Sequence, residues 1–385
     1  MEQAELENIA PFNDEEAVAA LAKVAHHPSV PWISKYIFPR QPETYLRDIL
    51  LNLHSIDEFQ RLVMNEAVEW VLKTTAHNFS YDGINNIPAD KKFLLMSNHR
   101  DIILDPAITQ MVLYRNGIPM TEICVGDNLL KSRTIEYLIR SNRMIKVIRG
   151  ISARELYLSS QILSKYIRES ITSGRSSVWI AQRQGRTKDG IDLTEQGLLK
   201  MFDMSGTKDF VQNFMELNII PLSISYEYEP CDILKARERL ISSTQKYVKT
   251  ENEDLQSIML GIKQQKGHIH LNIGQPLTEE EIIAASVCDK NDRYQAIRHA
   301  VDRRVIEGYQ LWKTNYIAYD LAHHTFKYTD HYTPEDVGRF IEYTEHQLDQ
   351  VEPSLNRQKL RDIFLGIYGN PVVSKEKLEA EKLEQ

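Results

Sequence analysis

The strongest chemical signal in the chain is a histidine followed closely by two aspartates. The apolar run Phe93–Ser97 leads to His99, and Asp101 and Asp105 come shortly after it. A histidine beside a carboxylate is a general-base unit, because the carboxylate fixes the tautomer of the imidazole and stabilises the imidazolium that forms. No serine or cysteine of the sequence lies in a nucleophile-elbow pattern. We therefore expect the histidine to activate a substrate hydroxyl directly, without a covalent intermediate.

Asp105 also fits a purely structural role. It stands directly before Pro106, an order typical of a helix N-cap followed by a proline in the first helical position. His99 on its own is also compatible with a hydrogen-bonded histidine of the core. The capping and catalytic roles of Asp105 do not exclude each other, since a cap position would hold the carboxylate in place for the imidazole.

A second apolar run ends in a basic residue beside a predicted helix start. Ile145–Ile148 leads into Arg149 and Gly150, and a helix with the capping-box pattern Ser152-x-x-Glu155 is predicted to begin at once. A fixed cation beside a helix N-terminus favours phosphate binding. The structural alternative is an arginine exposed at the end of a strand.

A third run, Ser177–Ala181, leads into a loop with glycines and three basic side chains. The loop carries Arg183, Gly185, Arg186 and Lys188. A loop that contains glycine can approach an anion closely, and its basic side chains offer several hydrogen-bond donors. An exposed basic turn is the alternative.

Short apolar runs alternate with amphipathic segments between residues 86 and 280. The helix predicted for residues 152–173 is the clearest, since Leu156, Leu163 and Ile167 recur on one face. An alternation of strands and helices predicts an α/β fold with a mostly parallel sheet flanked by helices. Catalytic groups of such folds commonly lie where strands give way to loops.

The two ends of the chain are predicted to be helical. We expect an N-terminal helical region at residues 1–85, the α/β domain at residues 86–280 and a C-terminal helical region at residues 281–385. No linker rich in proline or glycine separates these regions. The helical ends are therefore expected to pack on the α/β core.

Composition and charge exclude several classes of protein. The formal net charge of -8 argues against generic nucleic-acid binding, which needs a basic surface to neutralise phosphates. The N-terminus carries no apolar signal-peptide segment, and no run approaches the roughly 18–20 apolar residues of a membrane span. Cys124, Cys231 and Cys288 match no metal-ligand spacing and are expected to be reduced thiols. We expect a cytoplasmic protein whose lipid contacts are peripheral, at the inner face of the cell membrane.

Two groups of polar residues are expected to have no catalytic role. The first group consists of Asp320, His323, His324, Asp330 and His331. No established ligand pattern fits this group, so no metal site is predicted. The second consists of His268 and His270, which share one face of a predicted strand. A half-exposed strand explains them without a function.

One predicted helix is rich in basic residues. These are Lys235, Arg237, Arg239, Lys246 and Lys249. Such a face could contact anionic lipid or an acidic carrier protein. A solvated helix face explains it at least as well.

The passage around His99 resembles a known family. Ser97-Asn98-His99 followed by Asp105-Pro106-Ala107 is similar to the first motif of the glycerol-3-phosphate and 1-acylglycerol-3-phosphate (lysophosphatidic acid) acyltransferase superfamily, the PlsC-like acyltransferases. In that family the histidine and the aspartate form the catalytic pair. Here the spacing is one residue longer, so Asp101 is a second candidate partner of His99. We expect Asp105, because it precedes the helix as the family's aspartate does.

Three further blocks occur in the family's order. Asn142–Gly150 resembles the second motif, whose arginine contacts the acceptor phosphate; Arg149 stands in that position. Val178–Gly190 resembles the third motif, in which many members have a glutamate where this chain has Gln184. Ile219–Glu227 resembles the fourth motif, an apolar strand with a proline that is implicated in lining the acyl-donor site.

The resemblance covers residues 85–280 and implies an acyltransferase. The implied reaction moves a fatty acyl group from acyl-CoA or acyl carrier protein to the hydroxyl of glycerol-3-phosphate or lysophosphatidic acid in phospholipid synthesis, with no cofactor and no metal. His99 and Asp105 would be catalytic. The implied substrate-binding residues are Arg149, Gly150, Arg183, Gly185, Arg186, Lys188 and Pro221. Three alternatives stay open: an O- or N-acyltransferase for an aminolipid, a thioester hydrolase and a non-catalytic lipid-binding protein.

Overall fold

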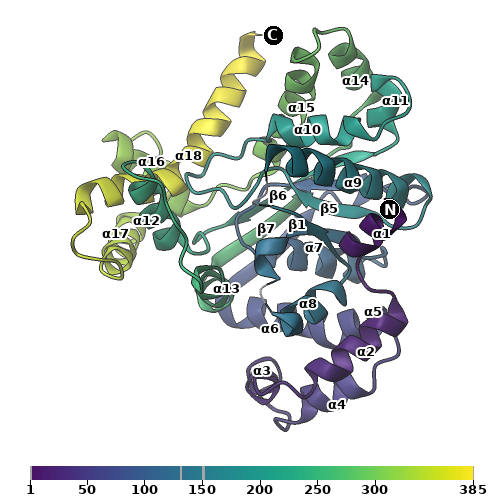
Figure 1. Ribbon diagram of the computed structural model, residues 1–385. Helices are drawn as coiled ribbons and strands as arrows, with labels where there is room; N and C mark the ends of the chain where they lie inside the picture. Colours follow the sequence, from purple (N-terminus) through teal and green to yellow (C-terminus); the bar gives the residue numbers. More distant parts are fainter. Residues whose placement is uncertain (1, 131, 150–151, 385) are drawn as a thin grey trace.

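A computed structural model describes residues 2–130, 132–149 and 152–384. Its centre is a seven-stranded sheet with the strand order β1-β7-β6-β2-β5-β3-β4 (Figure 1). The strands are β1 (Ala76–Asp82), β2 (Leu94–Ser97), β3 (Glu122–Gly126), β4 (Met144–Val147), β5 (Val178–Ala181), β6 (Ile219–Tyr226) and β7 (Gly267–Ile273). Neighbouring strands are parallel except β6 and β7, which are antiparallel. The predicted fold class, a mostly parallel sheet flanked by helices, is confirmed.

The central strands are apolar on both faces. Every residue of β2 and β6 is buried. Leu94 and Met96 pack into the apolar cluster on one face of the sheet, and Leu95 packs into the cluster on the other. A strand covered by helices on both sides is a continuous apolar run, without alternation. This is why both strands were recognisable in the sequence.

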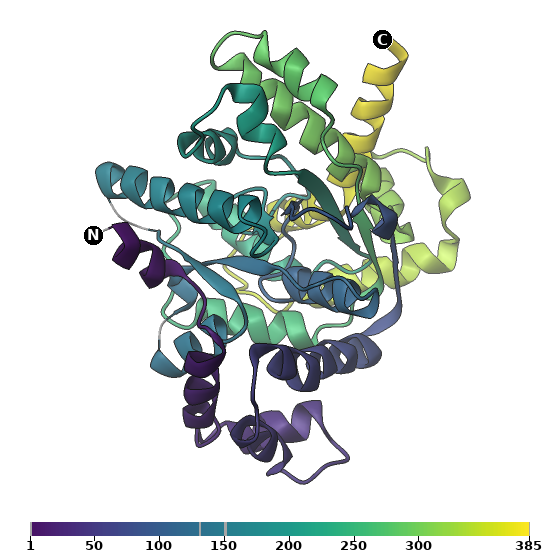
Figure 2. The same cartoon turned by 90° about the vertical axis from the view of Figure 1, so that its right-hand side faces the viewer.

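Helices cover both faces of the sheet (Figures 1 and 2). One apolar cluster holds residues of α1 (Glu2–Ile9), α9 (Ala153–Thr172), α10 (Gln196–Met204), α11 (Phe210–Met215), α14 (Glu279–Ser286) and α15 (Asp292–Gly308). The opposite cluster holds residues of α6 (Asn65–Thr75), α7 (Leu104–Arg115) and α13 (Glu253–Lys263). Helix α7 begins directly after the loop that carries His99, so its packing against the sheet also fixes that loop.

The N-terminal helices form a small bundle beside the sheet. It consists of α2 (Asp14–Val24), α3 (Val30–Ile37), α4 (Tyr45–Leu51), α5 (Ile56–Phe59) and a π-helical turn, η1 (Gln60–Met64), and it packs against α8 (Arg133–Arg140). Strand β1 follows α6 at once, inside the region expected to be helical. It was not predicted, because its sequence AHNFSYD contains no apolar run.

Three C-terminal helices and one earlier helix pack around a third apolar cluster. The C-terminal helices are α16 (Lys313–His323), α17 (Pro334–Leu348) and α18 (Arg357–Glu384), and the earlier one is α12 (Asp232–Ser242). Asn370 of α18 donates a hydrogen bond of 2.6 Å to the carbonyl of Asp189, so this helix also holds the loop that follows β5. Among the described residues, no helix combines the length and the apolar character that crossing a bilayer requires.

Candidate functional site

His99 and Asp105 form a hydrogen-bonded pair at the carboxyl end of β2. His99 Nδ1 lies 3.0 Å from Asp105 Oδ2. The Asp105 side chain is fully buried, whereas 15% of the His99 side chain is exposed, so a substrate can reach the imidazole. The ring packs edge-on against Trp179 of β5, with 6.2 Å between the ring centroids. With Nδ1 turned to the carboxylate, Nε2 is the nitrogen placed to accept a proton.

The Asp105 carboxylate is held by donors from two other parts of the chain. Its Oδ2 accepts hydrogen bonds from the backbone N–H groups of Arg100, at 2.6 Å, and Asp101, at 2.8 Å. Its Oδ1 accepts a 2.8 Å hydrogen bond from the hydroxyl of Tyr226, at the end of β6. Burial, together with the adjacent Asp105, raises the pKa of Tyr226, so this hydroxyl keeps its proton and remains a donor. The hydrogen bonds to both oxygens fix the carboxylate relative to the imidazole.

Asp101 has a different task from Asp105. Its Oδ1 accepts hydrogen bonds from the backbone N–H groups of Ile103, at 2.9 Å, and Leu104, at 2.8 Å. Ile103 is the N-cap residue and Leu104 the first residue of α7, so Asp101, two residues before the N-cap, satisfies N–H groups at the start of this helix and acts as a capping side chain. The prediction that Asp105 is the N-cap was wrong, because Asp105 lies inside the first turn. The extra residue between His99 and Asp105 lies in this turn, and Asp105 still reaches His99.

A network of buried charges lies beneath the His99 loop. Arg100 is fully buried and donates from Nη2 to Asp192 Oδ2, at 2.5 Å. Lys235 Nζ donates to Glu229 Oε1 and to the carbonyl of Arg100, each at 2.6 Å. Breaking such a network leaves an uncompensated buried charge, which is strongly destabilising. The network therefore fixes the backbone that presents His99.

The sequence did not point to this network. The prediction that Lys235 lies on a solvated helix face, or contacts lipid or a carrier protein, was wrong, because only 1% of this residue is exposed. Tyr226 was also missed, since it closes an apolar strand whose other residues are core. A buried tyrosine or lysine has no distinguishing pattern in one sequence.

Arg149 lies where β3 and β4 end. Its backbone N–H donates a 3.1 Å hydrogen bond to Asp127. Its guanidinium packs over Gly126, where a Cβ atom would lie 2.7 Å from Arg149 Cζ. Burial lowers the pKa of Arg149, and nearby carboxylates, among them Asp254, act in the opposite direction. Gly150, the other predicted binding residue of this motif, lies outside the described residues.

The loop after β5 lies against the His99 loop. The backbone N–H of Thr187 donates a 2.8 Å hydrogen bond to the carbonyl of His99. Arg186, the preceding residue, is 9% exposed, and its buried Nη1 has no hydrogen-bond partner within the described part of the chain. Buried polar groups are normally hydrogen-bonded. The Arg186 side chain lies against Cys231, directly before α12, and its role in binding an anion stays a prediction.

The other two basic side chains of this loop have partners within the protein. Lys188 forms an ion pair with Glu238, and Arg183 donates a 3.4 Å hydrogen bond to the hydroxyl of Thr187. Gly185 provides the turn, with φ 74°, and Gln184 is exposed. Pro221 is not at this edge. It is buried inside β6, opposite Met96 of β2.

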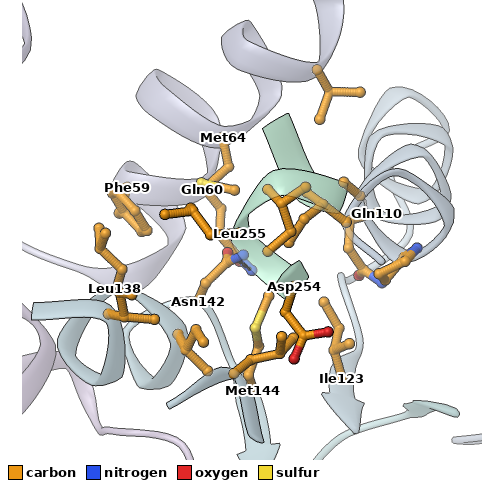
Figure 3. A pocket seen from close by; sticks show the side chains of 18 of the residues that line it. Phe59, Gln60, Met64, Gln110, Ile123, Leu138, Asn142, Met144, Asp254 and Leu255 are labelled. Carbon is orange, nitrogen blue, oxygen red and sulfur yellow. Dashed lines mark hydrogen bonds between the residues drawn. The ribbon is translucent and has the colours of Figure 1, made fainter. Parts of the chain in front are cut away.

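An apolar cavity of about 400 Å³ (Figure 3) reaches the first turn of α7, which carries Asp105. Ile103, Pro106 and Ala107, which flank Asp105 in the chain, are part of its wall. Its other walls come from α5, η1, α6, α8, β3, β4 and α13, with side chains such as Phe59, Met64, Ile123, Leu138, Met144 and Leu255 (Figure 3). A cavity of this size and character is typical of a binding site for an apolar group.

Two glutamines in the cavity wall have hydrogen-bond partners. Gln60 donates a 3.2 Å hydrogen bond to Asn142. Gln110 exchanges hydrogen bonds with Thr121, outside the cavity lining. The Oδ1 atom of Asn65, in the same wall, is buried without a partner among the described residues, so a ligand meets a mostly apolar surface with one unpaired amide oxygen.

Part of the chain that contains His99 and Asp105 matches a known enzyme family. Residues 78–226, from β1 to the end of β6, match the Acyltransferase family. Among solved structures, the chain is similar to the 1-acyl-sn-glycerophosphate (LPA) acyltransferase PlsC from Thermotoga maritima, with 12% sequence identity and a TM-score of 0.41. That similarity covers 76% of this chain and 94% of the other. No curated protein matches the sequence.

The hydrogen bond from Tyr226 to Asp105 can be tested by removing one oxygen atom. We expect Tyr226→Phe to lower kcat for acyl-thioester turnover about tenfold with KM nearly unchanged, since a hydrogen bond to a charged group contributes about 1.5–3 kcal/mol. Tyr294→Phe is the matched control, because Tyr294 is also a buried tyrosine whose hydroxyl donates to a carboxylate, that of Asp203, and it belongs to the apolar cluster on the other face of the sheet. Both variants should lose stability in chemical denaturation, and an equal loss of kcat in both would contradict a role of Tyr226 in positioning Asp105.

Proposed function

With an acyltransferase domain at residues 78–226, this protein is an acyltransferase, and we propose that it moves a fatty acyl group from a thioester to the hydroxyl of a glycerol-phosphate acceptor. One observation carries the proposal. The partly exposed imidazole of His99 is hydrogen-bonded to a buried carboxylate, and it lies between a basic loop and the start of an apolar cavity. These three features match the three parts of the reaction: a hydroxyl to deprotonate, a phosphate to hold and an acyl chain to bury.

The proposed chemistry is a direct transfer. His99 Nε2 takes the proton of the acceptor hydroxyl as its oxygen attacks the thioester carbonyl carbon, and Asp105 stabilises the resulting imidazolium. The tetrahedral intermediate collapses with cleavage of the C–S bond. The departing thiolate then takes the proton from the imidazolium, which returns the histidine to its starting state. The proposal uses no metal and no cofactor.

The basic residues support a phosphate-bearing acceptor. Arg186 has a buried nitrogen without a partner in the described structure, and its neighbour Thr187 is hydrogen-bonded to His99. Arg149 is a second candidate, from the end of β4, which is separated from β5 by β3. Lys188, which pairs with Glu238, contributes less. We propose glycerol-3-phosphate or lysophosphatidic acid as the acceptor, because a guanidinium binds phosphate oxygens in a fixed orientation.

The apolar cavity supports a long acyl chain on the donor. Burial of each methylene group contributes about 0.8 kcal/mol, so a chain within the cavity would hold the donor strongly. Since the wall begins at the first turn of α7, the carbonyl end of that chain would lie at Asp105 and His99. We propose acyl-CoA or acyl carrier protein as the donor, in phospholipid synthesis at the surface of a membrane.

The role of His99 is tested by thiol release. Acyl-CoA and acyl carrier protein donors are combined with glycerol-3-phosphate and with lysophosphatidic acid, and the free thiol is measured. We expect acceptor-dependent release by the wild-type protein and a loss of about 10³-fold or more in His99→Ala, because the general base is removed. His346→Ala, in which an exposed histidine of α17 is removed, should remain fully active.

Each other outcome identifies another function. Thiol release that does not depend on an acceptor would indicate a thioester hydrolase. Turnover with an aminolipid in place of both phosphate acceptors would indicate the other acceptor class. Lipid binding without turnover would indicate a binding protein. Full activity of His99→Ala would contradict the mechanism itself.

The assignment of the acyl chain to the cavity gives a second prediction. Val68 of α6 lines the cavity, and the substitution Val68→Phe would fill part of it. We expect kcat/KM for a palmitoyl thioester to fall about tenfold more than that for an octanoyl thioester, since the longer chain needs more of the space. Val248→Phe is the control, because Val248 is 75% exposed and is not part of the wall. An equal effect of Val68→Phe on both chain lengths would place the acyl chain elsewhere.

A further inference from the structure

Two histidines and a glutamate converge where β1, β7 and β6 meet. His77 lies in β1, His268 lies in β7, and Glu227 directly follows β6. One ligand-capable atom of each residue lies within 4.8 Å of those of the other two. Imidazole nitrogen and carboxylate oxygen are common zinc ligands. The sequence gave no sign of this group, because its members are far apart in the chain and His268 was expected to have no function.

An irregularity in β1 brings His77 to this place. In the pairing of β1 with β7, Ala76 lies opposite Gly267 and Asn78 lies opposite His268, so His77 is an extra residue on β1. Such a bulge changes the direction in which a side chain points. The rings of His77 and His268 then lie edge to face, with 6.0 Å between their centroids.

The carboxylate of Glu227 can approach because residue 267 has no side chain. A Cβ atom on Gly267 would lie 2.3 Å from Glu227 Oε2. The same oxygen accepts a 3.0 Å hydrogen bond from the backbone N–H of His268, and it lies 3.9 Å from His268 Nε2. Glu227 is anchored in turn, since its backbone N–H donates a 2.8 Å hydrogen bond to the carbonyl of His268.

The ring of His268 is held from another side by Trp312. The two rings are stacked, with 5.4 Å between centroids and 20° between planes. The His268 side chain is nevertheless 43% exposed, and His77 is exposed, so an ion can enter from solvent. Two ligands of the group are therefore preorganised, and the third is free to adjust.

We propose that His77, His268 and Glu227 bind a zinc ion, with water in the fourth position. Ligand atoms around tetrahedral zinc lie roughly 3.4 Å apart, as bond lengths of about 2.1 Å require. His268 Nε2 and Glu227 Oε2 are 3.9 Å apart, and all three ligand atoms lie within 4.8 Å of one another, so small rotations of the His77 and His268 side chains close the difference. Three protein ligands with an open position make an accessible site, and imidazole favours zinc over magnesium or calcium.

A zinc ion at this site would connect the edge strand β1 to the rest of the sheet. β1 is the outermost strand and pairs only with β7 within the described structure. A zinc ion would join β1 to β7 and to the end of β6. Because the ion binds the folded chain, it should stabilise the protein in proportion to its concentration. This inference does not depend on the proposed acyl transfer.

The test is zinc binding to the full chain without a histidine tag, after treatment with EDTA. Zinc is titrated in competition with a chromogenic chelator, and bound metal is counted by mass spectrometry after dialysis. We expect about one zinc ion per chain, no retention of magnesium, and a loss of affinity of about tenfold or more in His77→Ala and in Glu227→Gln. His270→Ala is the matched control, since His270 is on the same face of β7 but outside the group, and it should bind zinc as the wild type does.

A thermal measurement keeps the test independent of folding defects. Zinc should raise Tm of the wild type and of His270→Ala, and it should leave Tm of His77→Ala unchanged. The exposed position of His77 makes this variant the mildest of the set for the fold. No zinc binding by the wild type, or equal binding by wild type and His77→Ala, would overturn the proposal.

Discussion

The buried carboxylate of Asp105 is the constraint on which the candidate active site depends. A buried carboxylate is tolerated only where hydrogen bonds replace its hydration. Here the donors come from the loop after β2, from His99 and from Tyr226 at the end of β6. The loop cannot move without losing these hydrogen bonds. A second layer of buried charge, with Arg100 and Lys235 as cations, holds the same loop from below.

The parallel sheet explains why residues far apart in the chain meet at this edge. The carboxyl ends of β2, β3, β4, β5 and β6 lie on one side of the sheet. Four of these strands each lead to a different group there: His99 follows β2, Arg149 follows β4, Arg186 follows β5 and Tyr226 closes β6. Helix α7 then joins this polar edge to the apolar cavity, because its first turn belongs to both.

The sequence was most informative where residues capable of catalysis follow a segment with a clear apolar pattern. The buried strands were recognisable because helices cover both of their faces, and His99 with Asp105 stood out because they follow such a strand. The sequence predicted Asp105 as the partner of His99, but it did not predict the residues that surround this pair. Asp101 caps α7 in place of Asp105, Lys235 is buried by its pairing with Glu229, and β1 pairs through polar residues. The Asp101 contacts are local and were missed because Asp105 stands directly before a proline. The burial of Lys235 and the pairing of β1 depend on contacts between distant segments, which local patterns do not record. The group of His77, Glu227 and His268 depends in the same way on the register of three strands.

The most direct measurement compares acceptor-dependent acyl transfer by Asp105→Asn and Asp101→Asn. An asparagine at position 101 can still cap α7, whereas an asparagine at position 105 removes the charge that stabilises the imidazolium. The account predicts that kcat of Asp105→Asn falls by about 10³-fold while that of Asp101→Asn stays near the wild-type value, with both proteins folded by circular dichroism. Wild-type kcat in Asp105→Asn, or the large loss in Asp101→Asn alone, would contradict it.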